Sequence, residues 1–241
     1  MGEKIKGIVL NVRKYNDRNC IVTLYTRERG RLSFISPIGA GKQANMRRAR
    51  LQPLSVIETE IHYKPTTELQ RLGSVITSEV WQDIYFDSTK RAMALFISEF
   101  LDRLLNASMP DPSLFEFLIN ALRWLDEMNT GSSDFHIPFL VALLRYSGIQ
   151  PDVSGYRPGY IFDFSSGGFV PEFEVKGPAI GLEDSVFVPL VCRINFSNIK
   201  RLRLTNVNRR QILYGLLNYY SYHFPGLGNL KSPEVLREIF M

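Results

Sequence analysis

The sequence has few cysteines and no long apolar run. Its 241 residues include only two cysteines, Cys20 and Cys192, each among apolar neighbours, so we expect buried free thiols and no disulfide. No stretch of about 18 apolar residues occurs, and the first residues lack the apolar core of a secretion signal. These absences argue against a disulfide-built extracellular domain, and they predict a soluble cytoplasmic protein with no membrane partner.

Catalytic motifs are missing as well. The three histidines, His62, His136 and His223, lie far apart in the chain, and there is no HExxH, P-loop or GxSxG motif. A catalytic site needs a nucleophile, a base and an orienting group that converge, and no such set can be assembled from this sequence. We therefore expect a protein that is not an enzyme.

Carboxylates are absent between Glu28 and Glu58, a stretch that is strongly basic. Residues 1–80 carry 14 Lys and Arg against seven Asp and Glu, which leaves 15 against 17 for the rest of the chain. Positive charge without local partners attracts polyanions, so this third of the chain is predicted to bind nucleic acid. The candidate DNA-binding residues are Arg13, Lys14, Arg29, Arg31, Lys42, Arg47, Arg48 and Arg50.

Alternating apolar and polar residues predict five strands within residues 4–80, with hairpin turns at 15–17 and 28–30. A long basic connection, residues 38–54, separates the third strand from the fourth. Five short strands with one long loop are typical of a closed barrel of the OB type, whose faces and loops bind single-stranded nucleic acid. Candidate aromatic residues for base stacking are Tyr15, Tyr25, Phe34 and Tyr63.

After Trp81 the apolar period becomes helical. Helices are expected at about 87–106, 111–128, 134–147, 206–222 and 232–240, with N-caps at Asp87 or Ser88, at Asp111 and at Asp134. Residues 149–195, rich in Gly, Pro and aromatics at their start, predict a β-rich insertion. The expected fold is therefore α+β: an OB-fold nucleic-acid-binding domain in residues 1–80, then an α-helical domain in residues 81–241 that contains the insertion.

A second acid-free run extends from Ser185 to Pro233. It fits a solvated helix face, a site for an acidic protein tail, or a second nucleic-acid surface. The candidate partner-binding residues of the helical domain are Arg123, Arg145, Arg201, Arg203, Arg209, Arg210 and Lys231.

Six segments, in order along the whole chain, are similar to one known family. They are KGIVLNVRKYND, IVTLYTRERGRLSFISPIGAGK and LQPLSVIE near the start, LLRYSGIQPD and FDFSSGGF in the middle, and HFPGLGNLKSPEVLREIF at the end. These segments resemble the bacterial RecO family of recombination mediators. The terminal Lys-Ser element of that family corresponds to Lys231 and Ser232.

The resemblance implies an N-terminal OB-fold, a helical domain and a non-enzymatic role in DNA repair by the RecF pathway of recombination. It also implies binding of single- and double-stranded DNA, annealing of complementary strands and association with the nucleoid. The implied protein partners are RecR and the acidic C-terminal tail of single-stranded DNA-binding protein (SSB), and the implied outcome is placement of RecA on SSB-coated DNA.

The sequence departs from this family in one segment. Many relatives carry two CxxC pairs there that form a structural zinc site, whereas residues 152–174 of this chain contain no cysteine. Zinc needs thiolate or imidazole ligands in tetrahedral geometry. We therefore expect no metal and no cofactor, and an insertion held by apolar side chains that include Tyr160, Phe162, Phe164 and Phe169.

Two other function classes fit a basic barrel. One is an OB-fold RNA-binding factor, which would read ribose 2′-hydroxyls. The other is a protein-docking scaffold, whose basic surface would bind an acidic partner protein.

Overall fold

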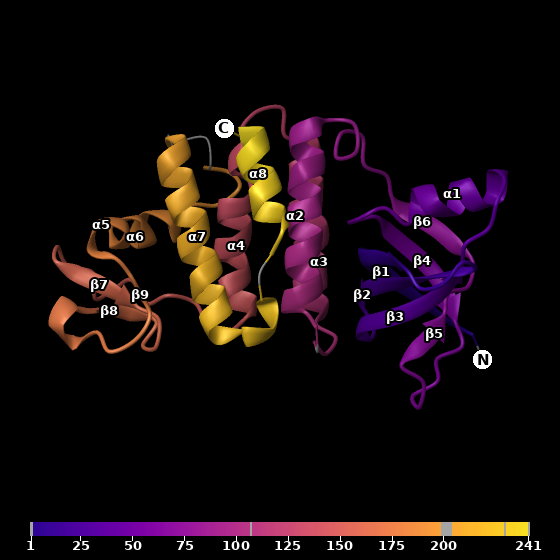
Figure 1. Cartoon of the computed structure of the whole chain (residues 1–241), viewed down its shortest axis with the longest axis horizontal. Coiled ribbons are helices and arrows are strands. Elements are labelled where there is room, and N and C mark those ends of the chain that lie inside the picture. Colours follow the sequence, from indigo (N-terminus) through magenta and orange to yellow (C-terminus); the bar gives the residue numbers. More distant parts are fainter. Residues whose placement is uncertain (1, 107, 199–203, 229, 241) are drawn as a thin grey trace. The chain divides into compact units, whose positions relative to one another are not determined.

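The structure is a computed structural model that describes residues 2–106, 108–198, 204–228 and 230–240, except for the side chains of residues 237–240 (Figure 1). The chain forms two compact units, Met1–Glu127 and Met128–Met241. The first unit thus extends beyond the expected domain of residues 1–80, because it also contains helices α2 (Ser88–Leu104) and α3 (Pro112–Glu127).

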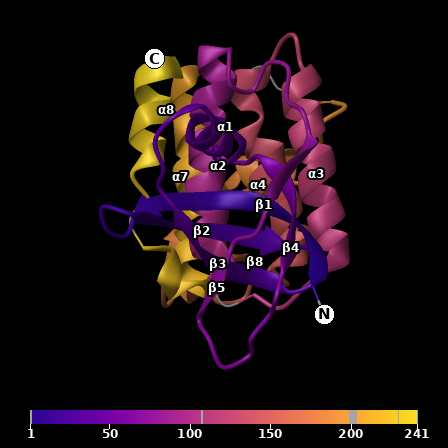
Figure 2. The same ribbon diagram turned by 90° about the vertical axis from the view of Figure 1, so that its right-hand side faces the viewer.

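The first unit contains a curled six-stranded sheet of OB-like form, in the order β5-β3-β2-β1-β4-β6 (Figure 2). Its strands are β1 (Glu3–Lys14), β2 (Asn19–Thr26), β3 (Gly30–Pro37), β4 (Val56–Ile61), β5 (Leu69–Arg71) and β6 (Val75–Glu79). With the helices that follow, this sheet confirms the expected α+β class. The sheet core is apolar and includes Ile5, Val9, Val22, Leu24, Phe34 and Ile57.

The expected fifth strand is two strands. β5 pairs in parallel with β3, and β6 pairs antiparallel with β4, with only residues 72–74 between them. One short segment therefore pairs with both sides of the sheet, which makes the sheet curl. A Cβ atom on Gly73 would clash with the carbonyl oxygen of Glu60, so the change of partner strand requires glycine.

The basic connection between β3 and β4 is largely a helix, α1 (Lys42–Arg50), and not the expected loop. Its start is weak, because the N-cap Gly41 offers no side-chain acceptor and the first turn holds no carboxylate. The contacts that stabilise α1 come instead from its arginines, described below. α1 lies at one end of the curled sheet (Figure 2).

Helices α2 and α3 pack on the sheet within the first unit. Asp87 caps α2 by accepting from the N–H of Lys90 at 2.8 Å, and Asp111 caps α3 by accepting from the N–H groups of residues 113 and 114, as the sequence predicts. The ring of Tyr25 contacts that of Phe115, with centroids 6.2 Å apart. Polar contacts between α2 and the sheet, including Asp102 with Asn11 at 2.9 Å, fix the helix position.

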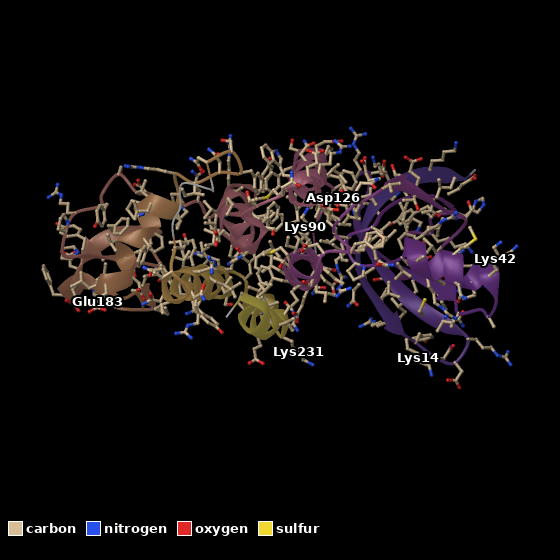
Figure 3. All side chains as sticks on the ribbon, turned by 90° about the horizontal axis from the view of Figure 1, so that it is seen from above. Lys14, Lys42, Lys90, Asp126, Glu183 and Lys231 are labelled. Carbon is tan, nitrogen blue, oxygen red and sulfur yellow. The ribbon has the colours of Figure 1, made fainter. Side chains whose placement is uncertain are left out.

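A buried carboxylate holds the segment between sheet and helices. Asp126 at the end of α3 accepts hydrogen bonds from the N–H groups of Gln82, Asp83 and Ile84, at 2.8, 2.8 and 2.9 Å. Lys90 of α2 is buried beside it and donates to the Asp126 carbonyl at 2.6 Å and to the Asp83 carboxylate at 2.9 Å. Figure 3 shows Lys90 and Asp126 close together.

The second unit combines helices with a small sheet in the order β8-β7-β9 (Figure 1). Its elements are η1 (Ser132–Asp134), α4 (His136–Tyr146), β7 (Tyr160–Asp163), β8 (Gly168–Pro171), η2 (Glu172–Glu174), β9 (Ala179–Ile180), α5 (Leu182–Ser185), α6 (Phe187–Val191), α7 (Asn206–His223), η4 (Pro225–Leu227) and α8 (Ser232–Phe240). The expected β structure between helices is thus present.

Asp134 is not the N-cap of α4, as the sequence suggested. It lies in the 3-10 turn before the helix, whose N-cap position is Phe135, and its carboxylate binds Arg209 of α7. A long-range ion pair has replaced the local cap here. The other end of α4 follows expectation, since Gly148 has φ 71° just beyond the helix.

No helix in the described part of the chain is both long enough and apolar enough to cross a membrane.

We expect the substitution Asp126→Ala to lower the free energy of unfolding by about 3 kcal/mol or more, because it removes the acceptor of three backbone N–H groups in a mostly buried site. Urea unfolding followed by circular dichroism measures this loss. The neighbouring exposed carboxylate Glu127 is the matched control, and Glu127→Ala should change stability by less than about 0.5 kcal/mol. Equal effects of the two substitutions would contradict this role of Asp126.

Candidate nucleic-acid interface

A basic groove lies on the first unit between the sheet and α1. It has a volume of about 280 Å³, and its cations are Lys14 of β1 and Arg47 and Arg48 of α1. Its apolar lining includes Val12 and Leu51. Side chains alternate along a strand, so Lys14 lies on the same face of β1 as Val12.

Two of the predicted DNA-binding arginines attach α1 to the sheet. The guanidinium of Arg47 donates to the carbonyl oxygens of Leu72 and Gly73 at 3.1 and 3.0 Å and to Ser36 Oγ at 3.0 Å. Arg50 donates to the carbonyl oxygen of Val75 at 2.7 Å. These carbonyls belong to the segment where the chain leaves β5 and joins β6. The two arginines therefore satisfy backbone acceptors that the change of partner strand leaves open.

Burial lowers the pKa of Arg47 from its ordinary value, and the nearby Cys20 acts weakly in the opposite direction. The guanidinium still lines the groove while it holds the sheet. Arg47 is thus suited to meet a phosphate in a fixed position, whereas its removal would also disturb the fold.

Lys42 and Arg48 are the more available cations of α1. Both are exposed, and the side chain of Lys42 has no partner within the described part of the chain. Arg48 bonds only to uncharged groups, the carbonyl of Gly39 at 2.6 Å and the amide oxygen of Asn45 at 3.4 Å. No carboxylate among the described residues therefore neutralises their positive charge.

The hairpin arginines are paired with carboxylates. Arg29 makes three hydrogen bonds of 2.9 to 3.1 Å to Glu3, which raise its pKa, and it lies 4.0 Å from the ring centroid of Tyr63. Arg31 binds Asp102 of α2 at 2.9 Å. The structure does not bring these two candidates into the groove, and their charge is compensated by residues far away in sequence.

Of the two cations at the end of β1, only Lys14 lines the groove. Arg13 is exposed on the opposite face of the strand. Lys14 also meets Asp17 at 2.7 Å, but both side chains are largely exposed, so water and salt screen this pair. Strand alternation was the signal in the sequence that could have separated Lys14 from Arg13.

The candidate aromatics divide in the same way. Tyr25 and Phe34 are fully buried in the core, and Tyr63 is covered by Arg29. Tyr15 at the β1–β2 turn is 57% exposed and is therefore the aromatic of this set that is accessible to a base.

The predicted partner-binding residues differ in whether a carboxylate pairs with them. Arg123 binds Glu79 at 2.7 Å, and Arg209 binds Asp134, so both are paired. Burial raises the pKa of Glu79, but hydrogen bonds from Arg123 and Lys6 outweigh it and hold the pKa below its usual value. Arg145, Arg210 and Lys231 are exposed. Arg201 and Arg203 lie outside the described residues.

The insertion has no ligand set that fits zinc. Among the described residues, no three His, Cys, Asp or Glu side chains are grouped as metal ligands. Asp163 of this segment is bound by nearby serines instead: it accepts from Ser165 Oγ at 2.6 Å and from the N–H of Ser166 at 2.8 Å. The buried rings of Phe162, Phe164 and Phe169 fill the interior.

Comparison with known proteins identifies the family. The chain matches the family model for the recombination protein O N terminus over residues 1–80 and the model for its C terminus over residues 85–156. It is 33% identical to the DNA repair protein RecO of Phocaeicola vulgatus over 240 residues, which cover all of both chains. The chain belongs to the RecO family.

Other RecO relatives have similar identities. The DNA repair protein RecO of Bacteroides fragilis is 32% identical over the full length of both chains, and that of Porphyromonas gingivalis is 33% identical over 98% of both. The resemblance seen in the sequence is thereby confirmed, and RecO homologues support a role in DNA repair and recombination.

Because the insertion is held by aromatic packing, we expect its stability to be independent of metal. Thermal unfolding in excess EDTA, and again after addition of zinc, should give the same midpoint within error. Elemental analysis of the purified protein is the accompanying measurement. A midpoint that falls in EDTA and returns with zinc would contradict this expectation.

His136 predicts a loss of stability in mild acid. Burial, followed by the positive charge of Arg209, lowers its pKa from 6.5 to about 3. Between pH 6.5 and 3 this imidazole is protonated in the unfolded chain but stays neutral in the folded chain. The free energy of unfolding therefore falls as the pH drops from 6.5 toward 3. At pH 5 the loss should be about 2 kcal/mol.

Urea midpoints at pH 7.5 and pH 5 measure this effect. His136→Leu should make the midpoint less dependent on pH across this range, even if the variant is less stable at both values. An unchanged pH dependence in the variant would assign the effect to other groups.

Proposed function

We propose that this RecO-family protein is a DNA-binding recombination mediator that acts in DNA repair without catalysing a reaction. It binds single- and double-stranded DNA, anneals complementary strands and associates with the nucleoid. The observation that carries this proposal is the basic groove, whose cations converge from β1 and α1 in a chain of the RecO family.

The groove supports binding by charge and not by base sequence. Its cations are arginine and lysine side chains, which contact phosphates and release the counterions that surround them. Annealing needs such screening, because two phosphate backbones repel each other as they approach. The protein should therefore show weak sequence preference and a strong dependence on salt.

The protein partners follow from the family and from the exposed cations of the second unit. We propose that the protein joins RecR, contacts the acidic tail of SSB and helps to place RecA on SSB-coated DNA. An acidic tail is attracted by an exposed cation without a carboxylate partner, and Arg145 has this property within the described residues.

The test separates binding cations from structural ones. Lys42→Ala with Arg48→Ala should make the logarithmic salt slope for single-stranded DNA shallower by about 1.4, because two phosphate contacts are lost, and should weaken binding about 25-fold at about 0.1 M salt. Fluorescence anisotropy of a labelled oligonucleotide across a salt series measures both quantities. Thermal stability should stay unchanged, since both side chains are exposed.

The matched control is Lys64→Ala with Arg71→Ala, two exposed cations of the same unit that belong neither to α1 nor to the groove. It removes the same charge and should leave the salt slope nearly unchanged. Equal losses in both double variants would show that general charge, and not α1 with the adjoining groove, binds DNA. No measurable binding of the native protein to DNA at low salt would refute the proposed function itself.

A further inference from the structure

The second unit contains a pocket that the proposed function does not use. It has a volume of about 290 Å³, and its lining comes largely from β9, α5, α6 and α7. Figure 1 shows these elements in the second unit. The pocket lining is mainly apolar, and the half-buried Phe187 and the partly exposed Tyr214 offer aromatic surface. Pockets of about 300 Å³ are at the small end of those that bind organic ligands.

The packing of α7 creates this space. Gly215 presents no side chain toward β9, and a Cβ atom there would already lie 3.5 Å from Ile180 Cδ1. Deeper in the pocket, the rings of Phe162 and Tyr219 meet edge to face, with centroids 5.2 Å apart. Tyr219 is held in place by its hydroxyl, which donates to the carbonyl of Ile149 at 3.0 Å. The walls are thus fixed by the fold.

The pocket is lined by two opposite charges that do not pair. Within the described part of the chain, neither the carboxylate of Asp184 nor the guanidinium of Arg210 makes a hydrogen bond or an ion pair. The amide side chains of Gln211 and Asn218 also line the pocket and likewise have no partner among the described residues. An acceptor, a cation and two amides are therefore available to a ligand.

These groups match a nucleotide better than a purely acidic or purely apolar ligand. A base has a π-face for Phe187 or Tyr214 and N–H groups that donate to a carboxylate such as Asp184. Its phosphate accepts from Arg210. An acidic peptide would be repelled by Asp184, and a hydrocarbon would leave both charges unpaired.

We propose that this pocket takes one unstacked base of a single-stranded nucleic acid, with Arg210 on the adjoining phosphate and Asp184 on the base edge. The acid-free run that begins at Ser185 supports an anionic ligand, because it contains Arg210 and offers no carboxylate of its own that could pair with this cation. The inference rests on the proposed function, and it adds a second nucleic-acid site to the one on the basic groove.

Photocross-linking tests the site in the full-length native protein. The probe is an oligothymidine strand of about 16 nucleotides in which some bases are replaced by 5-iododeoxyuridine, which cross-links to aromatic side chains. After irradiation and proteolysis, mass spectrometry should find cross-links on peptides that contain Phe187 or Tyr214. Cross-links confined to residues 1–127, in a protein that binds the strand, would overturn the inference and leave the proposed function intact.

Two variants test the roles of the charges. Arg210→Ala should reduce the yield of cross-links in the second unit by about tenfold or more, since it removes a charge-assisted contact. Arg193→Ala is the matched control, because Arg193 is an exposed arginine of the same unit that does not line the pocket. The cross-link yield of this variant should stay within about twofold of the native yield. Equal losses in both variants would overturn the assignment of Arg210.

A peptide ligand is the competing outcome. An acidic peptide that ends in an aromatic residue can be titrated into the native protein and into Arg210→Ala by anisotropy. If Arg210→Ala abolishes peptide binding but leaves the cross-links unchanged, the pocket binds peptide and the inference is wrong. Absence of any oligonucleotide binding would remove the proposed function and this inference together.

Discussion

The carboxylate of Asp126 is the interaction on which the first unit depends. A single charged group at the end of α3 satisfies three successive backbone N–H groups of residues 82–84. Burying a carboxylate is costly unless it is hydrogen-bonded, and here three N–H groups satisfy it. The buried Lys90 strengthens the same junction, because it donates to the backbone carbonyl of Asp126 and pairs with the Asp83 carboxylate. The segment that leaves the sheet is thereby fixed against the helices.

The same segment also reaches back to the sheet. The indole N–H of Trp81 donates to the carbonyl of Leu54 at 3.0 Å, and the hydroxyl of Tyr85 bonds to Ser55 Oγ and to the carbonyl of Pro53. Leu54 has a positive φ of 62°, which is unusual for a leucine. The contacts named above hold the backbone of Leu54 in this conformation, together with the hydrogen bond that its N–H donates to the carbonyl of Val9. The residues between α1 and β4 are thus locked, and α1 leads into a rigid connection.

Charge in the basic stretch serves two purposes. A run of arginines without acids looks like a phosphate-binding loop, yet Arg47 and Arg50 place their guanidinium groups on carbonyls at the change from β5 to β6. A guanidinium carries five donors, so Arg47 can hold the sheet and still line the groove. Through Arg47, positive charge at the groove is therefore linked to the change from β5 to β6 that curls the sheet.

Sequence alone determined the α+β class, most strand positions, the caps at Asp87 and Asp111, and the location of the excess positive charge. These features depend on local periodicity, on hydrogen bonds within a few residues and on composition. The sequence could not show that Glu3 and Asp102 neutralise Arg29 and Arg31, that Asp134 pairs with Arg209, or that β5 and β6 join opposite sides of the sheet. Each of these contacts joins residues far apart in the chain. Only the tertiary structure decided which cations remain free for a ligand, since a charge is available only when the fold brings no carboxylate to it.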